Sequence, residues 1–221
     1  MKPENDPIPA NGAPAPFVPS KEFRRYDKTK RAIDFVFALF LLLLCAVPGC
    51  LIAVIITATS RGSAVFKQTR IGRGGRPFEC YKFRTMYENA PRNRATCDFG
   101  DVKQYITPFG DLLRKTSLDE LPQIFNILKG EMSFIGPRPL IPEEADIHED
   151  RMRRGVYALR PGLSGLAQVN GRDRVGGKEK VDFDEQYLHH YSLKQDISIF
   201  INTILGVLKG SDIVDGEETD S

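Results

Sequence analysis

Two adjacent carboxylates, Asp119 and Glu120, lie in the stretch LLRKTSLDELPQ, shortly after the cation Arg114. Such a pair can bind Mg²⁺ or attack a phosphorus atom. Residues 117–120 also fit the S-x-x-E capping box, which predicts that both acids lie in the first turn of a helix, where the macrodipole favours negative charge. Pro122 allows that helix to begin as late as Leu121. The spacing alone leaves a cap and a reactive site both open.

Two cations lie on one face of a predicted strand upstream of the acid pair. The stretch AVFKQTRIGRGGRPFECYKFRTM predicts two short strands around a glycine-rich turn. Period-two alternation in the second strand places Lys82 and Arg84 on the same face as Phe78 and Cys80. These cations can bind a phosphate or face anionic lipid headgroups, and the spacing does not separate the two.

Arginine recurs further on in loops that are rich in glycine and proline. The turn GPRP fixes Arg138 between two prolines, and the stretch RPGLSGLAQVNGRDR supplies Arg160, Asn170, Arg172 and Arg174. Glycine lets backbone N–H groups approach a ligand, and arginine matches phosphate oxygens in a bidentate manner. These loops therefore indicate a phosphorylated substrate.

An apolar run over residues 35–57 contains no charged residue and is long enough to cross a bilayer core. Cationic residues flank both of its ends, and such flanks prefer the cytoplasmic side. A helix that enters, breaks at Pro48 and returns satisfies both flanks, and we expect this re-entrant form over a kinked single span. The later segment ISIFINTILGVLKG is too short to span, and it fits a core helix or an interfacial one.

The remaining composition sets the outline of the chain of 221 residues. We expect a disordered tail over residues 1–20, a juxtamembrane and membrane segment over 21–60, a catalytic domain over 61–210 and an acidic tail over 211–221. The four cysteines lack metal-ligand spacing, which disfavours a zinc site or a disulfide framework. The three histidines (His148, His189 and His190) are expected at the surface, and the net charge of +2 does not argue for nucleic acid.

Several long motifs occur in a recognisable order: a proline-broken membrane run, YKFRTM, LRKTSLDELPQ, GEMSFIGPRP and RPGLSGLAQVNGR. Over about residues 28–210 the chain resembles the small monotopic phosphoglycosyl transferases, a bacterial sugar transferase family. The resemblance implies an α+β fold, with a re-entrant membrane helix before a compact, mostly helical catalytic domain that has a small β-hairpin and interfacial helices. One departure is Val47, where the family pattern would place a serine before Pro48.

The resemblance also implies a reaction. Such enzymes transfer a sugar-1-phosphate from a UDP-sugar to a polyprenyl phosphate such as undecaprenyl phosphate, with Mg²⁺ as cofactor and UMP as product. Asp119 matches the family nucleophile, which forms a covalent phosphosugar intermediate, and Glu120 assists through the metal or by accepting a proton. Both acids would be metal ligands. The positions that match near the substrate phosphates are Lys82, Arg114 and Arg138, and Asp184 falls near a family acidic position.

Together with these, Arg84 and Arg172 complete the phosphate-binding residues expected from the sequence. We expect arginines to hold Asp119 ionised, since opposite charge favours the charged form. The location implied is the cytoplasmic face of a bacterial inner membrane, where the protein starts a surface glycan, contacts phospholipid and could form a homodimer. Two other interpretations remain: a membrane-anchored scaffold that binds anionic lipid or partners without turnover, and a glycosyltransferase that releases UDP. The sequence does not identify the sugar.

Overall fold

The computed structural model describes residues 17–90, 102–171 and 176–209, and it has the predicted α+β composition. A long helix, α1 (Lys21–Thr59), leads into a hairpin of β1 (Val65–Ile71) and β2 (Pro77–Phe83). Seven residue pairs align antiparallel across this hairpin, from Val65 opposite Phe83 to Ile71 opposite Pro77. The glycine-rich turn between the strands forms a short 3-10 helix, Arg73–Gly75. The hairpin prediction is therefore confirmed.

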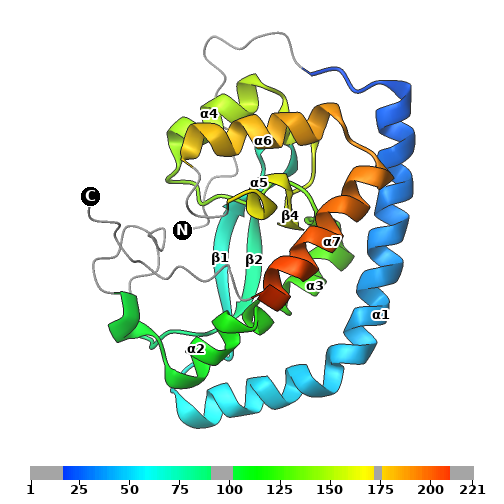
Figure 1. The fold of residues 1–221 in the computed structure, drawn as a ribbon. Helices are drawn as coiled ribbons and strands as arrows, with labels where there is room; N and C mark the ends of the chain where they lie inside the picture. Colours follow the sequence, from blue (N-terminus) through cyan, green and yellow to red (C-terminus); the bar gives the residue numbers. More distant parts are fainter. Residues whose placement is uncertain (1–16, 91–101, 172–175, 210–221) are drawn as a thin grey trace.

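Short helices surround the hairpin and a second, parallel pair of strands (Figure 1). This pair joins β3 (Ser133–Ile135) to β4 (Gly162–Ser164), with Ser133 opposite Gly162. The other α-helices are α2 (Pro108–Lys115), α3 (Gln123–Lys129), α4 (Ala145–Arg153), α5 (Leu166–Val169), α6 (Gly177–His189) and α7 (Leu193–Lys209). The remaining 3-10 helices are Val102–Tyr105, Leu118–Glu120 and Val156–Ala158.

Helix α1 bends along its length and places both of its arms against the same body (Figure 1). Ala38 of the first arm is fully buried against α3 and β2, whereas Ile52 and Ile56 of the second arm pack near Phe83. Pro48 lies inside the helix between these contacts, and proline removes one helical hydrogen bond. Among the described residues, α1 is the one helix with the length and hydropathy to cross a membrane.

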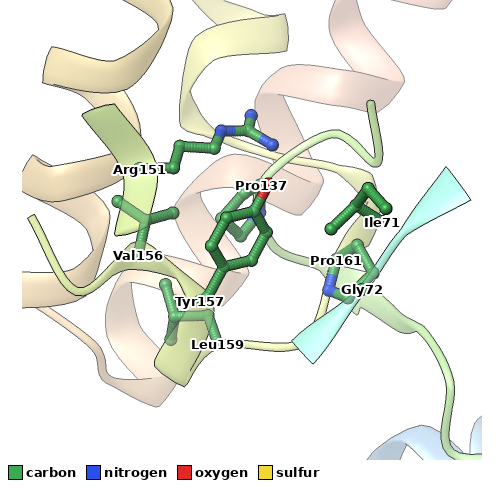
Figure 2. Close-up of a pocket in the computed structure, with 8 residues that line it drawn as sticks. All are labelled: Ile71, Gly72, Pro137, Arg151, Val156, Tyr157, Leu159 and Pro161. Carbon is green, nitrogen blue, oxygen red and sulfur yellow. The ribbon is translucent and has the colours of Figure 1, made fainter. Parts of the chain in front are cut away.

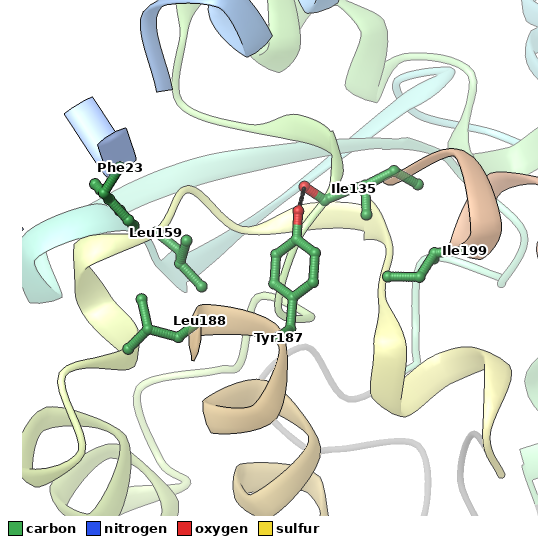
Figure 3. Packing of buried hydrophobic residues seen from close by; sticks show 6 residues of the cluster. All are labelled: Phe23, Ile135, Leu159, Tyr187, Leu188 and Ile199. Atoms are coloured by element: carbon green, nitrogen blue, oxygen red, sulfur yellow. Dashed lines mark hydrogen bonds between the residues drawn. The ribbon is translucent and has the colours of Figure 1, made fainter. Parts of the chain in front are cut away.

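A core cluster joins α1 to the C-terminal half of the chain. It contains Phe23, Ile135, Leu159, Tyr187, Leu188 and Ile199 (Figure 3). The hydroxyl oxygen of Tyr187 lies 3.3 Å from the carbonyl oxygen of Ile135 and donates its proton to Asp196 at 2.5 Å. Sequence segments more than a hundred residues apart therefore meet in one interior.

The apolar segment for which the sequence allows a core helix or an interfacial one forms α7, and α7 has an exposed apolar surface. Ile199 is buried, but most of the apolar side chains along α7 are exposed: Ile197, Phe200, Ile201, Ile204, Leu205 and Val207. Phe200 meets Phe37 of α1 with ring centroids 6.2 Å apart. The exposed apolar residues of α7 and α1 are thus neighbours, which is unusual for a surface that faces water.

The surface prediction for histidine is wrong at one position. His148 is 1% exposed, because α4 turns it inward, where Nε2 lies 2.7 Å from the carbonyl of Ile141 and Nδ1 contacts the hydroxyl of Tyr157. Burial lowers its pKa, so the ring is neutral in the fold. His189 and His190 are exposed, as predicted. Of the segment 1–20, the described part begins at Phe17, which packs edge-on against Phe23.

Candidate active site

The acid pair lies in a tight turn between two helices rather than in the first turn of one. Residues Leu118–Glu120 form a 3-10 helix, and α3 begins only at Gln123. Ser117 has φ 55° and ψ 16°, in the left-handed region, and its side chain makes no capping hydrogen bond. The capping-box prediction is therefore wrong, and the helix begins two residues after Leu121. The physical reason is the turn itself, which is closed by backbone bonds such as Glu120 N to Ser117 O at 3.3 Å.

This turn has consequences for the electrostatics predicted from the sequence. Both acids precede α3, a helix of only seven residues, so the macrodipole argument no longer applies to them. A serine in the left-handed region costs free energy relative to ordinary backbone geometry. Such strain is often found where a chain must present a side chain for function.

Two hydrogen bonds tie α3 to the neighbouring strand β2. The side chain of Asn126, which is fully buried, accepts from the backbone N–H of Tyr81 at 3.0 Å and donates to the carbonyl of Glu79 at 2.6 Å. The next residue of the strand, Lys82, is thereby held beside the turn that carries the acids. Helix α2 completes the arrangement from the other side, with Arg114 in its last turn.

Lys82 binds the two carboxylates unequally. Its Nζ atom lies 2.6 Å from Oε1 of Glu120 and 4.0 Å from Oδ2 of Asp119. The first distance is a charge-assisted hydrogen bond, whereas the second is an electrostatic contact beyond hydrogen-bond length. All three side chains are mostly buried but retain some exposure, so a ligand can still reach them.

The environment moves the pKa values of the two carboxyl groups in opposite directions. Burial raises the pKa of Asp119, and the charge of Glu120 adds to this, while Lys82 and Arg114 oppose it. Arg114 favours the ionised form of Asp119, as the sequence predicts, but burial outweighs the cations in the net direction of the pKa shift. A carboxylate with a raised pKa is the more basic one, which suits a nucleophile.

The pKa of Glu120 moves in the opposite direction to that of Asp119. Burial by itself would raise its pKa, but the charges of Lys82 and Arg138 and the hydrogen bonds from Lys82 and Gln123 outweigh burial and lower it. Glu120 is thus held ionised beside a more basic Asp119. Neighbouring carboxyl groups with separated pKa values commonly divide acid, base and nucleophile roles between them.

Three of the predicted phosphate-binding residues lie close enough to act on the acid pair. Lys82 contacts both acids, the charge of Arg114 acts on Asp119, and the charge of Arg138 acts on Glu120. The Arg138 side chain is exposed and available to a ligand. The site therefore combines two carboxylates with three cations.

Other predicted residues lie elsewhere. Arg84 donates to the carbonyl of Ser60 at 2.8 Å and to that of Arg61, so it binds the C-terminal end of α1. Asp184 is buried and pairs with Arg151 at 2.6 Å, away from the acid pair. Arg172 and Arg174 lie outside the described residues.

The other two residues from the arginine-rich loops have structural partners. Arg160 donates to Asp27 of α1 at 2.8 Å, and the side-chain amide of Asn170 donates to the carbonyl of Leu166 at 2.8 Å. These bonds link the loops to the rest of the fold. Their role in the structure is therefore one of local support.

Sequence reasoning missed Arg70, a mostly buried cation on β1. Its Nη1 atom donates to the carbonyl of Pro139 at 3.0 Å, and its charge interacts with Arg138 and Glu120. The available signal was the period-two spacing from Gln68, whose Oε1 accepts from Nη2 of Arg70 at 2.6 Å. That spacing is common in strands, so it did not single out this residue.

The acid pair supplies two carboxylates, which are ligands of the kind that Mg²⁺ prefers. Among the described residues, no group of three or more histidine, cysteine, aspartate or glutamate side chains could enclose a metal on its own. Mg²⁺ is usually held by one or two carboxylates together with substrate phosphates and water. Asp119 and Glu120 supply that number of carboxylates.

Comparison with known proteins places the chain in context. The family model described as bacterial sugar transferase matches residues 25–210. The exopolysaccharide production protein ExoY of Sinorhizobium fredii is 36% identical over 194 residues, which cover 81% of this chain and 85% of that protein. The UDP-glucose:undecaprenyl-phosphate glucose-1-phosphate transferase of Caulobacter vibrioides is 40% identical over 193 residues, or 82% of this chain and 70% of that protein.

Some relatives are much longer. The undecaprenyl-phosphate galactose phosphotransferase of Salmonella typhimurium is 37% identical over 195 residues, which are 81% of this chain but 40% of that protein. The chain likewise spans 34% of an uncharacterized sugar transferase of Haemophilus influenzae and 40% of the UDP-galactose-lipid carrier transferase of Erwinia amylovora. The residues that the family model matches, 25–210, include the acid pair.

Proposed function

The chain belongs to the bacterial sugar transferase family, and from this membership we propose that it transfers a sugar-1-phosphate from a UDP-sugar to undecaprenyl phosphate. The products are undecaprenyl diphosphate-sugar and UMP. The relatives' names, which include glucose-1-phosphate and galactose phosphotransferases, support this reaction class. The proposal includes a role at the first membrane step of a surface polysaccharide.

One observation carries the catalytic part of the proposal: the separated environments of Asp119 and Glu120. Lys82 forms its short bond with Glu120 and leaves Asp119 at 4.0 Å, while burial raises the pKa of Asp119. The observed inequality leaves a basic carboxylate next to three cations, which suits attack on an anionic phosphorus.

The reaction then proceeds in two displacements. An oxygen of Asp119 bonds to the sugar-bearing phosphorus, and the bond from that phosphorus to the bridging oxygen breaks, so UMP leaves with the electron pair. A phosphate oxygen of undecaprenyl phosphate next attacks the same phosphorus and breaks its bond to Asp119, which restores the carboxylate. Glu120 accepts the proton of the incoming phosphate or helps to hold the metal. Lys82, Arg114 and Arg138 stabilise the phosphate charges in both steps.

We also propose Mg²⁺ as the cofactor, held by Asp119 and Glu120 together with the diphosphate of the donor. When bound, the ion neutralises phosphate charge and makes phosphorus more electrophilic. Arg138 would also neutralise phosphate charge, because its exposed guanidinium can bind phosphate oxygens in a bidentate manner.

The membrane part of the proposal is a re-entrant α1 with both ends on the cytoplasmic face. It is supported by the cationic flanks, by the bend of the helix and by the packing of Ala38 and Ile52 on one body. A straight span would carry the second arm away from that body. The exposed apolar residues of α1 and α7 would then contact phospholipid. Both substrates would meet at the membrane surface, where undecaprenyl phosphate resides.

A product assay tests the proposal. The full chain, purified in nanodiscs with undecaprenyl phosphate and Mg²⁺, is supplied with UDP-glucose or UDP-galactose, and the released nucleotide is identified. We expect UMP, dependent on the lipid and abolished by Asp119→Asn or by EDTA. Release of UDP would assign a different glycosyl transfer, and lipid binding without any turnover would assign a scaffold. Asp111→Asn, on the surface of α2, is the matched control and should remain active.

A further inference from the structure

The GPRP turn is held by an unusual set of hydrogen bonds. Four successive backbone carbonyls, at residues 137–140, accept bonds from three separate parts of the chain. The donors are Gly162 N to Pro137 O (2.9 Å), Arg151 Nη1 to Arg138 O (2.8 Å), Arg70 Nη1 to Pro139 O (3.0 Å) and Ile71 N to Leu140 O (2.9 Å). This segment is therefore fixed on every residue by groups outside it.

Proline explains why outside donors are required. Pro137 and Pro139 have no N–H group, so the turn cannot form the regular bonds of a helix or sheet. Its carbonyls are nevertheless close to the protein interior, where an unpaired carbonyl costs free energy. The two side-chain donors are both arginines, and they bind the carbonyls of Arg138 and of the residue after it.

Arg151 divides its guanidinium between two partners. Nη1 binds the carbonyl of Arg138, and Nη2 binds Oδ2 of Asp184 at 2.6 Å. Both side chains of this ion pair are at most 3% exposed. Figure 2 shows the Arg151 guanidinium reaching over Pro137 and Tyr157. The cavity that they line has a volume of about 10 Å³, room for no more than one water molecule, so it is not a substrate site.

Arg70 supports the next peptide unit of the turn, through the carbonyl of Pro139. Its Nε and Nη2 atoms donate to Oε1 of Gln68 at 3.1 and 2.6 Å, which leaves Nη1 directed at the carbonyl of Pro139. A planar guanidinium can hold such a divided geometry, whereas the single ammonium of a lysine cannot. Two guanidinium groups thus hold the carbonyls of Arg138 and of the residue that follows it.

Close backbone contact completes the support. A Cβ atom on Gly136 would lie 2.3 Å from the carbonyl oxygen of Arg160, and one on Gly162 would lie 2.1 Å from the N atom of Gly136. Only glycine allows the two loops to approach this closely. The GPRP turn and the loop before β4 therefore form one rigid unit.

We propose that Arg70 and Arg151 are positioning residues that fix the Arg138 side chain near Glu120 of the acid pair, and that Asp184 acts on the reaction only by holding Arg151. The inference rests on the proposed function, in which Arg138 binds a substrate phosphate. It gives Asp184 an indirect role in place of direct contact with substrate. The simpler alternative is that Arg151 and Asp184 form an ion pair that only stabilises the fold.

A double-mutant cycle separates these two roles. The variants are Arg138→Met, Arg151→Lys and the double variant, with Asp184→Asn and Arg70→Lys as further single changes. We expect Arg151→Lys to lower kcat/KM for UMP release by about tenfold to a hundredfold, because small misplacements of a binding group cost this much. Since Arg151 acts through Arg138, the double variant should be no slower than Arg138→Met alone. Losses that multiply would overturn the proposal, as would full activity of Arg151→Lys.

A second measurement does not depend on turnover. Hydrogen exchange of the peptide covering residues 133–144 should be faster in Arg151→Lys, Arg70→Lys and Asp184→Asn than in the wild-type chain, while exchange in α1 stays unchanged. If the wild-type chain releases no UMP from either donor, the proposed function falls, and the exchange result still decides whether these side chains hold the turn. Unchanged exchange in all three variants contradicts the proposal.

The matched control is a second buried ion pair, between Lys30 and Asp196, which joins α1 to α7. Asp196→Asn removes a buried charge partner of the same kind but lies outside the GPRP turn. We expect it to lower the melting temperature without changing KM for the UDP-sugar or the exchange of residues 133–144. A KM change of the same size in this control would show that loss of stability alone explains the effect, and the positioning role would be rejected.

Discussion

Two groups in which a lysine faces an aspartate, Lys30 with Asp196 and Lys82 with Asp119, are built differently. Asp196 accepts hydrogen bonds from Lys30, from the hydroxyl of Tyr26 at 2.6 Å and from that of Tyr187 at 2.5 Å. Asp119 instead lies 4.0 Å from its lysine, whose short bond goes to Glu120. The first carboxylate is saturated with donors and joins three helices. The second has a raised pKa and keeps some exposure, so under the proposed function stability and reactivity fall to different aspartates.

The largest expected effect comes from breaking the reactive group. Asp119→Asn should lower the rate of UMP release on the order of a thousandfold or more, because an amide cannot form the phosphoaspartate. The measurement is single-turnover UMP release, with denatured protein analysed by mass for the bound phosphosugar. Retention of the wild-type rate would rule out Asp119 as the nucleophile. Glu120→Gln serves as the companion variant, in which a slowed reaction still passes through the intermediate.

Breaking the hydrogen-bonded group around Asp196 should lower stability and leave the catalytic rate unchanged. Asp196→Asn leaves Lys30 buried without its charge partner, and removal of one partner of a buried ion pair costs about 3–5 kcal/mol. We expect a clear fall in the thermal midpoint with kcat unchanged at temperatures where the variant is folded. The conservative control is Tyr26→Phe, which removes one donor and should cost about 1 kcal/mol. An active-site defect in Asp196→Asn at low temperature would contradict the separation of the two groups.

Lys82 tests the link between the two acids. Lys82→Met removes the cation that lowers the pKa of both carboxyl groups, so both pKa values should rise. We expect turnover to fall about a hundredfold, as when one electrostatic stabiliser of a transition state is removed. Lys115→Met is the control, because Lys115 forms an exposed pair with Asp111 and should change turnover little. Equal effects of the two changes would show that only general positive charge matters.

The raised pKa of Asp119 makes a prediction about stability and pH. An acid whose pKa is higher in the folded state than in the unfolded state favours folding at low pH, and this contribution is lost as the pH rises through the folded pKa. In EDTA, Asp119→Asn should therefore melt above the wild-type chain at neutral pH, and the difference should vanish on acidification. A lower melting temperature for the variant at every pH would mean that Asp119 is stabilised by its ionic contacts.

The smallest effect concerns the backbone of the acid-bearing turn. Ser117 has positive φ, which glycine adopts at no steric cost. Ser117→Gly should raise the free energy of unfolding by about 0.5–1 kcal/mol, part of the cost of a left-handed residue. Ser117→Ala keeps the strain and should show no gain, since the side chain makes no capping bond. A large loss of stability in Ser117→Ala would restore the capping role.

The sequence predicted local features well and distant contacts poorly. The hairpin, the membrane run and the acid pair follow from short patterns that one segment contains in full. The failures share a cause: the S-x-x-E pattern describes a helix start, but Pro122 and the left-handed Ser117 produce a separate turn before α3. His148 is predicted at the surface because nothing in its own segment indicates that its ring forms hydrogen bonds with the hydroxyl of Tyr157 and the carbonyl of Ile141.

The site shows the same division. Lys82, Arg114 and Arg138 could be selected by residue type and motif, and the structure brings them to the acids. The two residues that support Arg138 could not be selected in this way. Arg70 and Arg151 are 81 residues apart in the sequence, and they bind backbone carbonyls, which every residue has. Hydrophobic periodicity and composition describe the types of side chains, whereas this support depends on which backbone segments lie close together in the fold. Arg84 was selected by the same alternation as Lys82, yet it binds the end of α1.

The contact between Gly136 and Gly162 restricts how this protein can change over generations. Because a Cβ at either position would meet backbone atoms, neither glycine can be replaced by a larger residue, whatever side chains the opposite loop carries. Both positions must therefore keep glycine independently, although they are separated along the gene. Chimaeras that exchange either loop between relatives should retain this junction only when the incoming loop carries glycine at its position.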